Sequence, residues 1–254
     1  MTLISPETAE LLEREAARIN SPEFIAADPV QFPRRFARQA DAEIAALLAA
    51  HLAWGNRKMI CRDTERLLQL MENRPADWVR DGAFESVDDD MNIHRTFFGR
   101  NLKHLMRGLE RIYSRHATLD AYAATLGLRG REGAPWLLAE ALNAEMAEAN
   151  GCSDSRCLPL NLGQTALKRL NMALRWLVRR DGIVDMGLWS ALDPADLYIP
   201  LDVHAGNTAR ALGLTSRRAN DRRTCEEITA AARTLRPDDP ALFDYALFGI
   251  GVGQ

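Results

Sequence analysis

Apolar residues recur at intervals of three and four positions along almost the whole chain, a spacing typical of helices with one buried face. Runs that alternate apolar and polar residues, as half-buried strands do, are missing from the sequence. We therefore predict an all-α protein without strands.

The apolar spacing and the capping residues together predict where the helices lie. A side-chain oxygen just before a helix can accept from its first backbone N–H groups, which suits Asp41, Asn56 and Asp202 as N-caps. The expected helices are 6–19, one from Asp41 to Leu52, one after Asn56, a turn around Trp78, 101–113, 118–126, 134–149, one opened by Gln164 or Thr165, 202–212, 221–235 and 240–249. The final GIGVGQ is expected to be a flexible tail.

Composition and charge exclude several classes of protein. The 254 residues are 47% hydrophobic and carry a net charge of −3, so the whole molecule has no electrostatic bias toward nucleic acid or anionic membranes. No apolar run is long enough to span a bilayer, and the first residues lack the pattern of a secretory signal. We expect a cytoplasmic monomer that does not bind membranes, with its four cysteines reduced and no bound metal or cofactor.

Positive charge is concentrated in one predicted helix, from about 165 to 180. Lys168, Arg175 and Arg179 fall on one side of it, opposite the apolar residues, and Arg169 and Arg180 widen this basic face. Such a face serves either solubility or the binding of phosphate groups. The sequence leaves both interpretations open.

A lysine and an aspartate form a candidate catalytic pair. Lys168 stands in the opening turn of its helix, where the helix dipole disfavours the charged ammonium and so favours a nucleophilic amine. Asp202 lies between apolar neighbours at the start of another helix, with His204 two positions later, and is a candidate general base or stabiliser of a cation. Spacing alone does not show whether the two side chains meet.

Several segments resemble the helix-hairpin-helix DNA glycosylases. LDVHAGNTARALGL (201–214) is similar to the segment that holds their catalytic aspartate, and KRLNMAL (168–174) to the segment of endonuclease III-like members that holds the Schiff-base lysine. DAEIAALLAAHLAWGNRK (41–58) resembles their early helix and base-wedge loop, and the segment 225–251 resembles their late helices. These matches follow the same order and cover most of the chain from residue 41 onward.

The resemblance has departures. The hairpin before the lysine reads LPLNLGQTAL (158–167) and lacks the tight glycine pair, and 34 positions separate Lys168 from Asp202. Both features are nearer to the archaeal 8-oxoguanine DNA glycosylases. The four-cysteine loop of endonuclease III is missing after Cys225, so no iron–sulfur cluster is predicted.

A second resemblance is more specific. AWGNRKMI, HRTFFG, KRLNM, IPLD and DYALFGIG are similar to segments of a bacterial family of conserved hypothetical proteins, a match that spans nearly the full length. This resemblance indicates a family for the chain but does not indicate an activity.

The glycosylase resemblance implies a two-lobed, all-α, helix-hairpin-helix glycosylase-like fold with an irregular hairpin. One lobe would be residues 42–165, and the other would combine 1–41 with 166–254 and carry Lys168 and Asp202. The implied function is a DNA glycosylase of base excision repair, bifunctional with AP lyase activity or monofunctional, that removes an oxidised purine such as 8-oxoguanine from double-stranded DNA.

The resemblance also implies roles for further residues. His51, Trp54, Asn56, Arg57 and His204 would form the base pocket or wedge, although His51 and Trp54 are equally well interpreted as core residues. Arg169, Arg175 and Arg179 would bind DNA phosphates. A non-catalytic DNA-binding or damage-sensing module on the same fold is the main alternative, and an enzyme with a substrate other than nucleic acid is a third.

Overall fold

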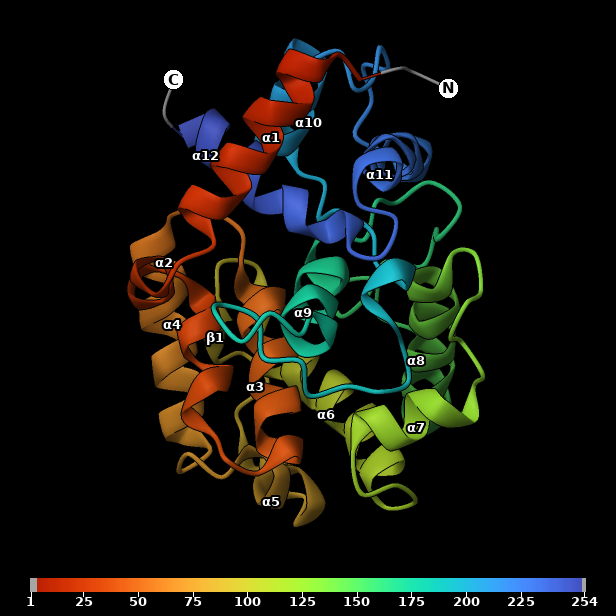
Figure 1. Cartoon of the computed structure of the whole chain (residues 1–254). Helices are drawn as coiled ribbons and strands as arrows, with labels where there is room; N and C mark the ends of the chain where they lie inside the picture. Colours follow the sequence, from red (N-terminus) through yellow and green to blue (C-terminus); the bar gives the residue numbers. More distant parts are fainter. Residues whose placement is uncertain (1–3, 253–254) are drawn as a thin grey trace. The chain divides into compact units, whose positions relative to one another are not determined.

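The computed structural model describes residues 4–252 and is helical throughout most of the chain (Figure 1). The residues form two compact units. The first unit comprises the chain up to Ala26, Arg129–Pro135 and the chain from Asn161 onward, and the second comprises Ala27–Leu128 and Trp136–Leu160. The prediction of an all-α protein is confirmed in its main feature.

The second unit contains the longer run of consecutive helices. Its elements are the short 3₁₀ helices η1 (Pro29–Gln31) and η2 (Pro33–Arg35), α3 (Gln39–Leu52), α4 (Arg57–Leu70), α5 (Pro75–Arg80), η3 (Ala83–Ser86), α6 (Gly99–Tyr113), α7 (Leu119–Thr125) and most of α8 (Ala134–Asn150). Nearly all of α3 is buried, and it packs against α4, α5, η1 and η2. This helix therefore forms the core of the unit.

The first unit is built around α12. Its elements are α1 (Pro6–Ile19), α2 (Pro22–Ala27), α9 (Lys168–Val178), η4 (Pro194–Asp196), α10 (Val203–Ala211), α11 (Arg222–Leu235), η5 (Pro240–Leu242) and α12 (Phe243–Val252). The strongly apolar α12 packs against both α1 and α10, and α1 and α12 lie side by side in Figure 1. Segments from opposite ends of the sequence thus share one core.

Capping residues account for where several helices begin. The side chains of Asn56, Asp202 and Asp221 each accept from a backbone N–H in the first turn of the helix that follows. The predicted caps at Asn56 and Asp202 are confirmed. Gly213, just after the helix that Asp202 opens, has a φ of 71° and ends that helix in the left-handed conformation.

The prediction for Asp41 is wrong. The helix starts at Gln39, so Asp41 lies in its first turn, and the Asp41 carboxylate accepts from the backbone N–H of Ala76 at 2.8 Å. Ala76 is in the first turn of α5, so Asp41 caps a helix 35 positions further along the chain. A contact between distant segments has replaced the local cap.

Three other boundaries differ from the prediction. Strands β1 (Asn92–His94) and β2 (Phe97–Phe98) form a small antiparallel sheet that is too short to produce an alternating pattern. The helix expected from Gln164 or Thr165 begins at Lys168, because Thr165 bridges to Asp221 and Leu167 takes a left-handed φ of 50°. Residues 249–252, expected in a flexible tail, continue α12.

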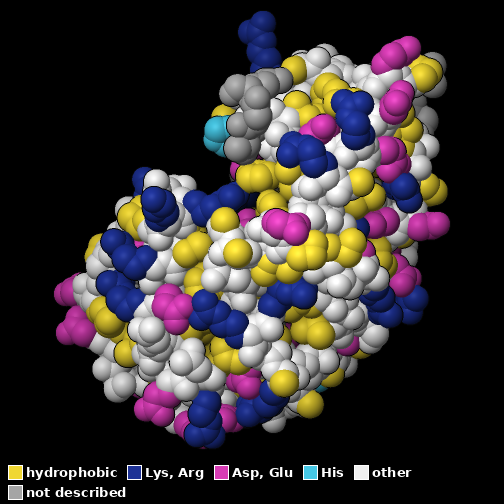
Figure 2. Space-filling model, turned by 60° about the vertical axis from the view of Figure 1, so that its left-hand side comes forward, with side chains coloured by type: hydrophobic (Ala, Val, Ile, Leu, Met, Phe, Trp, Pro, Cys, Tyr) yellow, Lys and Arg dark blue, Asp and Glu magenta, His cyan; other side chains and the backbone are white. Residues whose placement is uncertain are grey.

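No helix within residues 4–252 combines the length and the apolar character that a bilayer span requires. Figure 2 shows that acidic, basic and hydrophobic side chains are interspersed over the face it presents.

Candidate functional site

Lys168 and Asp202 meet in the first unit. The Nζ atom of Lys168 lies 3.9 Å from Oδ2 of Asp202, which is an ion pair without a direct hydrogen bond. The side chains of Lys168 and Asp202 are 27% and 41% exposed, so both can be reached from solvent while remaining partly covered. The two residues that the sequence singled out therefore stand together, 34 positions apart in the chain.

Two helix N-termini build this pair. Lys168 is the first residue of α9, and Asp202 is the N-cap of α10, where its Oδ1 accepts from Ala205 N at 2.9 Å. Since Oδ1 is used by the cap, Oδ2 is the oxygen that faces the lysine. The helix dipoles place partial positive charge at both termini, so both side chains lie near the positive end of a helix.

The segment before α9 fixes the position of Lys168. Thr165 pairs with Asp221 in an isolated bridge, and the backbone N–H of Arg222 donates to Gln164 O at 3.0 Å. Leu167 then turns the chain through its left-handed conformation, so that α9 starts at the lysine. The start of α11 thus anchors the peptide that presents the candidate nucleophile.

Arg175 and Arg179 do not lie on an exposed face. Their side chains are only 4% and 2% exposed, and carboxylates surround both guanidinium groups. Arg175 pairs with Asp185 and Asp244. The sequence left a solvated and a phosphate-binding face open, and these two side chains are instead buried because aspartates from later segments fold over them.

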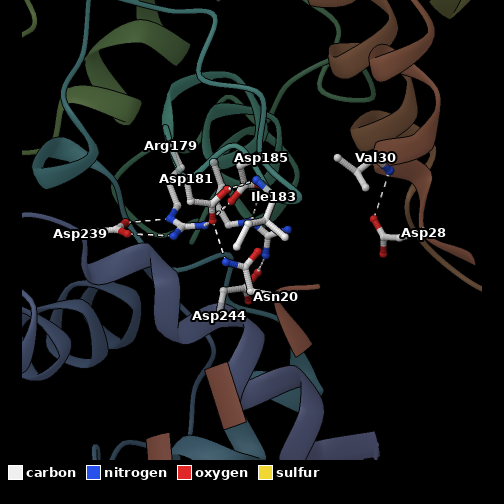
Figure 3. A network of polar contacts seen from close by, with 10 residues as sticks. Asn20, Asp28, Val30, Arg179, Asp181, Ile183, Asp185, Asp239 and Asp244 are labelled. Atoms are coloured by element: carbon white, nitrogen blue, oxygen red, sulfur yellow. Dashed lines mark hydrogen bonds and ion pairs between the residues drawn. The ribbon is translucent and has the colours of Figure 1, made fainter. Parts of the chain in front are cut away.

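The buried network around Arg179 is drawn in Figure 3. Arg179 donates through Nε and Nη2 to both oxygens of Asp239, each at 2.8 Å, and through Nη1 to Asp181 at 2.9 Å and to Asp185. Asn20, just after α1, donates to the same oxygen of Asp181, Oδ2, at 2.7 Å. The network joins α9, the loop that follows it, and the residues before α12 and after α1.

Burial and pairing shift the pKa values in this network. Burial lowers the pKa of Arg179, but the carboxylates of Asp239, Asp185 and Asp181 outweigh this effect and leave it above its ordinary value. Burial raises the pKa of Asp185 despite both arginines. These charges stabilise one another in the interior, which leaves Arg175 and Arg179 occupied rather than available for phosphate.

Asp244 is a site residue that the sequence analysis missed. It lies in the first turn of α12, its side chain is 13% exposed, and it accepts a hydrogen bond from Arg175 Nη1. Burial raises its pKa to about 6, Arg175 and Lys168 oppose the rise, and Asp202 adds to it. Lys168 and Asp202 thus act electrostatically on a carboxyl group that titrates near neutral pH. A lone acid in the apolar segment FDYALFGIGV was the available signal.

The remaining predicted residues of the first unit have less distinctive surroundings. His204 is exposed on α10, directly beyond Val203, which is also exposed at 62%. Arg169 is half-buried next to Lys168.

The predicted wedge residues lie together in the second unit, at the end of α3 and the start of α4. His51 is buried, with its ring centre 4.5 Å from that of Phe97, which agrees with a core role. Trp54 is half-buried, and Asn56 uses its side-chain oxygen to cap α4. Arg57 is exposed and lies 3.8 Å from Asp28. Of this group, Asn56 and Arg57 are exposed.

Among residues 4–252, no cluster of histidine, cysteine, aspartate and glutamate is arranged to hold a metal ion. Residues 28–253 match the model of a family described as "Protein of unknown function (DUF2400)". No curated protein matches the chain. No solved structure matches it either.

Proposed function

We propose that this chain, which belongs to the DUF2400 family, is a DNA glycosylase that removes an oxidised purine such as 8-oxoguanine and uses Lys168 as a Schiff-base nucleophile. The observation that carries the proposal is the 3.9 Å approach of Lys168 Nζ to Asp202 Oδ2 where α9 and α10 begin. An amine at the start of a helix, beside a carboxylate that can take its proton, is what this chemistry requires.

In the proposed reaction the neutral amine of Lys168 attacks C1′ of the damaged nucleotide. A C1′–N bond forms as the glycosidic bond breaks, and the base leaves with the bonding electrons and takes a proton from water. The proton released by the new C1′–N group passes to Asp202. Opening of the sugar ring gives an imine, from which loss of a C2′ proton and departure of the 3′ phosphate would complete a lyase step.

Asp244 fits this scheme as a positioning residue. Its pKa of about 6 lets it change charge near neutral pH, and that charge acts on both Lys168 and Asp202. An ionised Asp244 favours the ammonium form of Lys168, whereas a neutral Asp244 favours the amine. Arg175, which is buried between Asp244 and Asp185, holds the group in place.

DNA is proposed as the substrate on the strength of the resemblance in sequence. The segments that resemble the glycosylase lysine and aspartate segments are those that supply Lys168 and Asp202, and these are the residues that meet. The choice of an oxidised purine rests on likeness to the archaeal 8-oxoguanine enzymes alone.

Borohydride trapping on duplex DNA tests the proposal, because hydride reduction converts the imine to a stable amine. Duplexes carrying 8-oxoguanine, uracil or an abasic site would be incubated with the wild type, Lys168→Ala and Asp202→Asn. The chain contains only three lysines, Lys58, Lys103 and Lys168, so the modified residue can be identified by peptide mapping. Lys103→Ala is the matched control, since Lys103 also pairs with an aspartate, Asp89, at 2.8 Å.

An adduct that forms in the wild type and Lys103→Ala but not in Lys168→Ala would support the nucleophile. Base release that requires Asp202 but leaves no adduct would reject Lys168 as the nucleophile and indicate a monofunctional glycosylase. If the wild type forms no adduct and releases no base from any of these lesions, the proposal is overturned.

A non-catalytic DNA-binding module is the second candidate, and one observation favours it. Lys168 and Asp202 are close enough to form an ion pair, and ion pairing stabilises the ammonium form, which is not nucleophilic. This candidate predicts duplex binding that weakens steeply with salt, with no base release.

A further inference from the structure

The hairpin of the second unit presents an arginine that the proposed function does not use. Strands β1 and β2 leave Arg95 and Thr96 as the turn between them, and Arg95 is exposed with a left-handed φ of 52°. This conformation costs a side chain other than glycine about 1 kcal/mol. The hairpin therefore holds an exposed cation at a position where glycine would adopt the backbone conformation with less strain.

Arg95 stacks on the ring of Trp54. The guanidinium carbon of Arg95 lies 4.5 Å from the centre of the Trp54 ring, in a cation–π contact. Gly55 makes room for it, since a Cβ atom at Gly55 would lie 2.5 Å from Arg95 Nη1. The stack thus depends on Trp54 and on glycine, which has no side chain, at position 55.

His94 fixes the hairpin and the Trp54 loop to each other. It is fully buried, with Nδ1 2.7 Å from Asp63 Oδ2 and Nε2 3.0 Å from the backbone oxygen of Trp54. A carbonyl oxygen can only accept, so Nε2 carries the hydrogen of that bond. Burial raises the pKa of Asp63, but hydrogen bonds from His94 and Arg62 outweigh it and hold that pKa below its ordinary value.

Strand β1, which leads into the turn, is also held in place by hydrogen bonds. Arg66 on α4 donates to the backbone oxygens of Asn92 and Ile93, both at 2.7 Å. Together with the His94 contacts, this makes the Arg95–Trp54 stack a preorganised feature of the second unit.

The charge of Arg95 is uncompensated. Several other arginines of the same unit face carboxylates, such as Arg35 with Glu65 at 2.6 Å and Arg107 with Glu85 at 2.5 Å. Within residues 4–252, no carboxylate lies within ion-pair distance of Arg95. Stacking on a ring uses the face of the guanidinium group and leaves its N–H donors at the edge.

We propose that the Arg95–Trp54 stack is a binding site for a backbone phosphate of DNA. A planar fork of N–H donors matches two phosphate oxygens, and a rigid, uncompensated cation loses little entropy when it binds. The proposal rests on the proposed function only in taking DNA as the partner. The contact positions the DNA strand and carries no sequence information of its own.

Equilibrium binding to a fluorescent duplex with a stable abasic-site analogue tests this site. Arg95→Asn removes the cation and the stack, and asparagine tolerates the left-handed conformation, so the hairpin should still fold. Arg95→Lys keeps the charge without the planar fork. The matched control is Arg100→Asn, since Arg100 also covers an aromatic ring, Phe98 at 4.8 Å, but is already paired with Asp90.

We expect Arg95→Asn to bind about five- to tenfold more weakly, with the slope of log K against log salt reduced by about 0.9. Arg95→Lys should keep the wild-type slope with a smaller loss of affinity, and Arg100→Asn should stay within about twofold of wild type. Thermal unfolding of each variant checks that the fold is intact.

Arg95→Asn binding with the affinity and salt slope of Arg100→Asn would overturn the inference. If the wild type still forms a Lys168 adduct in that case, the glycosylase proposal stands without this site. If binding depends on Arg95 but the wild type forms no Lys168 adduct, the phosphate site is supported and the Schiff-base chemistry is rejected. A wild-type chain that binds no duplex would overturn the inference by itself.

Discussion

Arg175 on α9 donates a hydrogen bond to Asp244 on α12, and its guanidinium carbon lies 4.0 Å from the ring centre of the adjacent Tyr245. The arginine is thus held between a carboxylate and an aromatic face. Through this contact the first turn of α12 is fixed to the helix that begins with Lys168. The protonation of Asp244 is therefore linked to the stability of the first unit.

Replacing Asp244 by asparagine should change how stability depends on pH. Burial raises the folded-state pKa of Asp244 from 3.8 to about 6, so the folded protein binds more protons than the unfolded chain between these values. The stability contributed by this group is fully present below about pH 4 and is lost as pH rises through about 6, an effect of about 3 kcal/mol. Urea unfolding across this range should show the free-energy difference between wild type and Asp244→Asn falling as pH rises. A constant difference would contradict the shifted pKa.

Removing Arg179 should destabilise the protein strongly. Arg179→Ala would leave the fully buried Asp185 without its closest cation, and breaking a buried pair costs about 3–5 kcal/mol. The neighbouring exposed Arg180, which donates to the backbone oxygen of Trp189 at 2.6 Å, provides the control, and Arg180→Ala should cost about 1 kcal/mol. Equal losses in chemical denaturation would argue that the buried network contributes little.

Two substitutions at Asp202 should separate its structural role from its chemical role. Asp202→Asn keeps an oxygen that can cap α10, whereas Asp202→Ala removes the cap and should cost about 1 kcal/mol. Both remove the carboxylate beside Lys168. We expect both to lose base release and only Asp202→Ala to lose stability. Activity retained by Asp202→Asn would show that the cap, and not the negative charge, is what matters.

A methyl group at Gly55 should disturb the Arg95–Trp54 stack. Gly55 has a φ of 108°, and a Cβ atom there would meet Arg95 Nη1, so Gly55→Ala should cost about 1–3 kcal/mol. Gly127→Ala provides a control at a positive φ of 58° with no atom within 4 Å of the new Cβ. Thermal unfolding should rank Gly55→Ala below Gly127→Ala, and the reverse order would count against a close packing of Arg95 on the loop.

The sequence predicts what depends on local periodicity and capping. The helices from Asn56, Asp202 and Asp221 start where their caps indicate, because the cap and the first turn are neighbours in the chain. The hairpin around Arg95 was missed, since two short strands held by His94 and Arg66 leave no alternating pattern.

The candidate site was predictable only in part. Lys168 and Asp202 were identified from residue type, local position and resemblance, but their meeting depends on how α9 and α10 pack. Arg175 and Arg179 look like surface cations because the aspartates that bury them, at 185, 239 and 244, come from later segments. A pattern along one helix does not show which side chains will cover it.

The packing of α1 against α12 also sets an order for folding during synthesis. The second unit ends at Leu160, so all of its residues are synthesised before α9 begins. Helix α1 is synthesised well before the residues that it contacts, since Arg236 and α12 follow more than 150 residues later. We therefore expect the apolar face of α1 to stay uncovered until α12 has been synthesised.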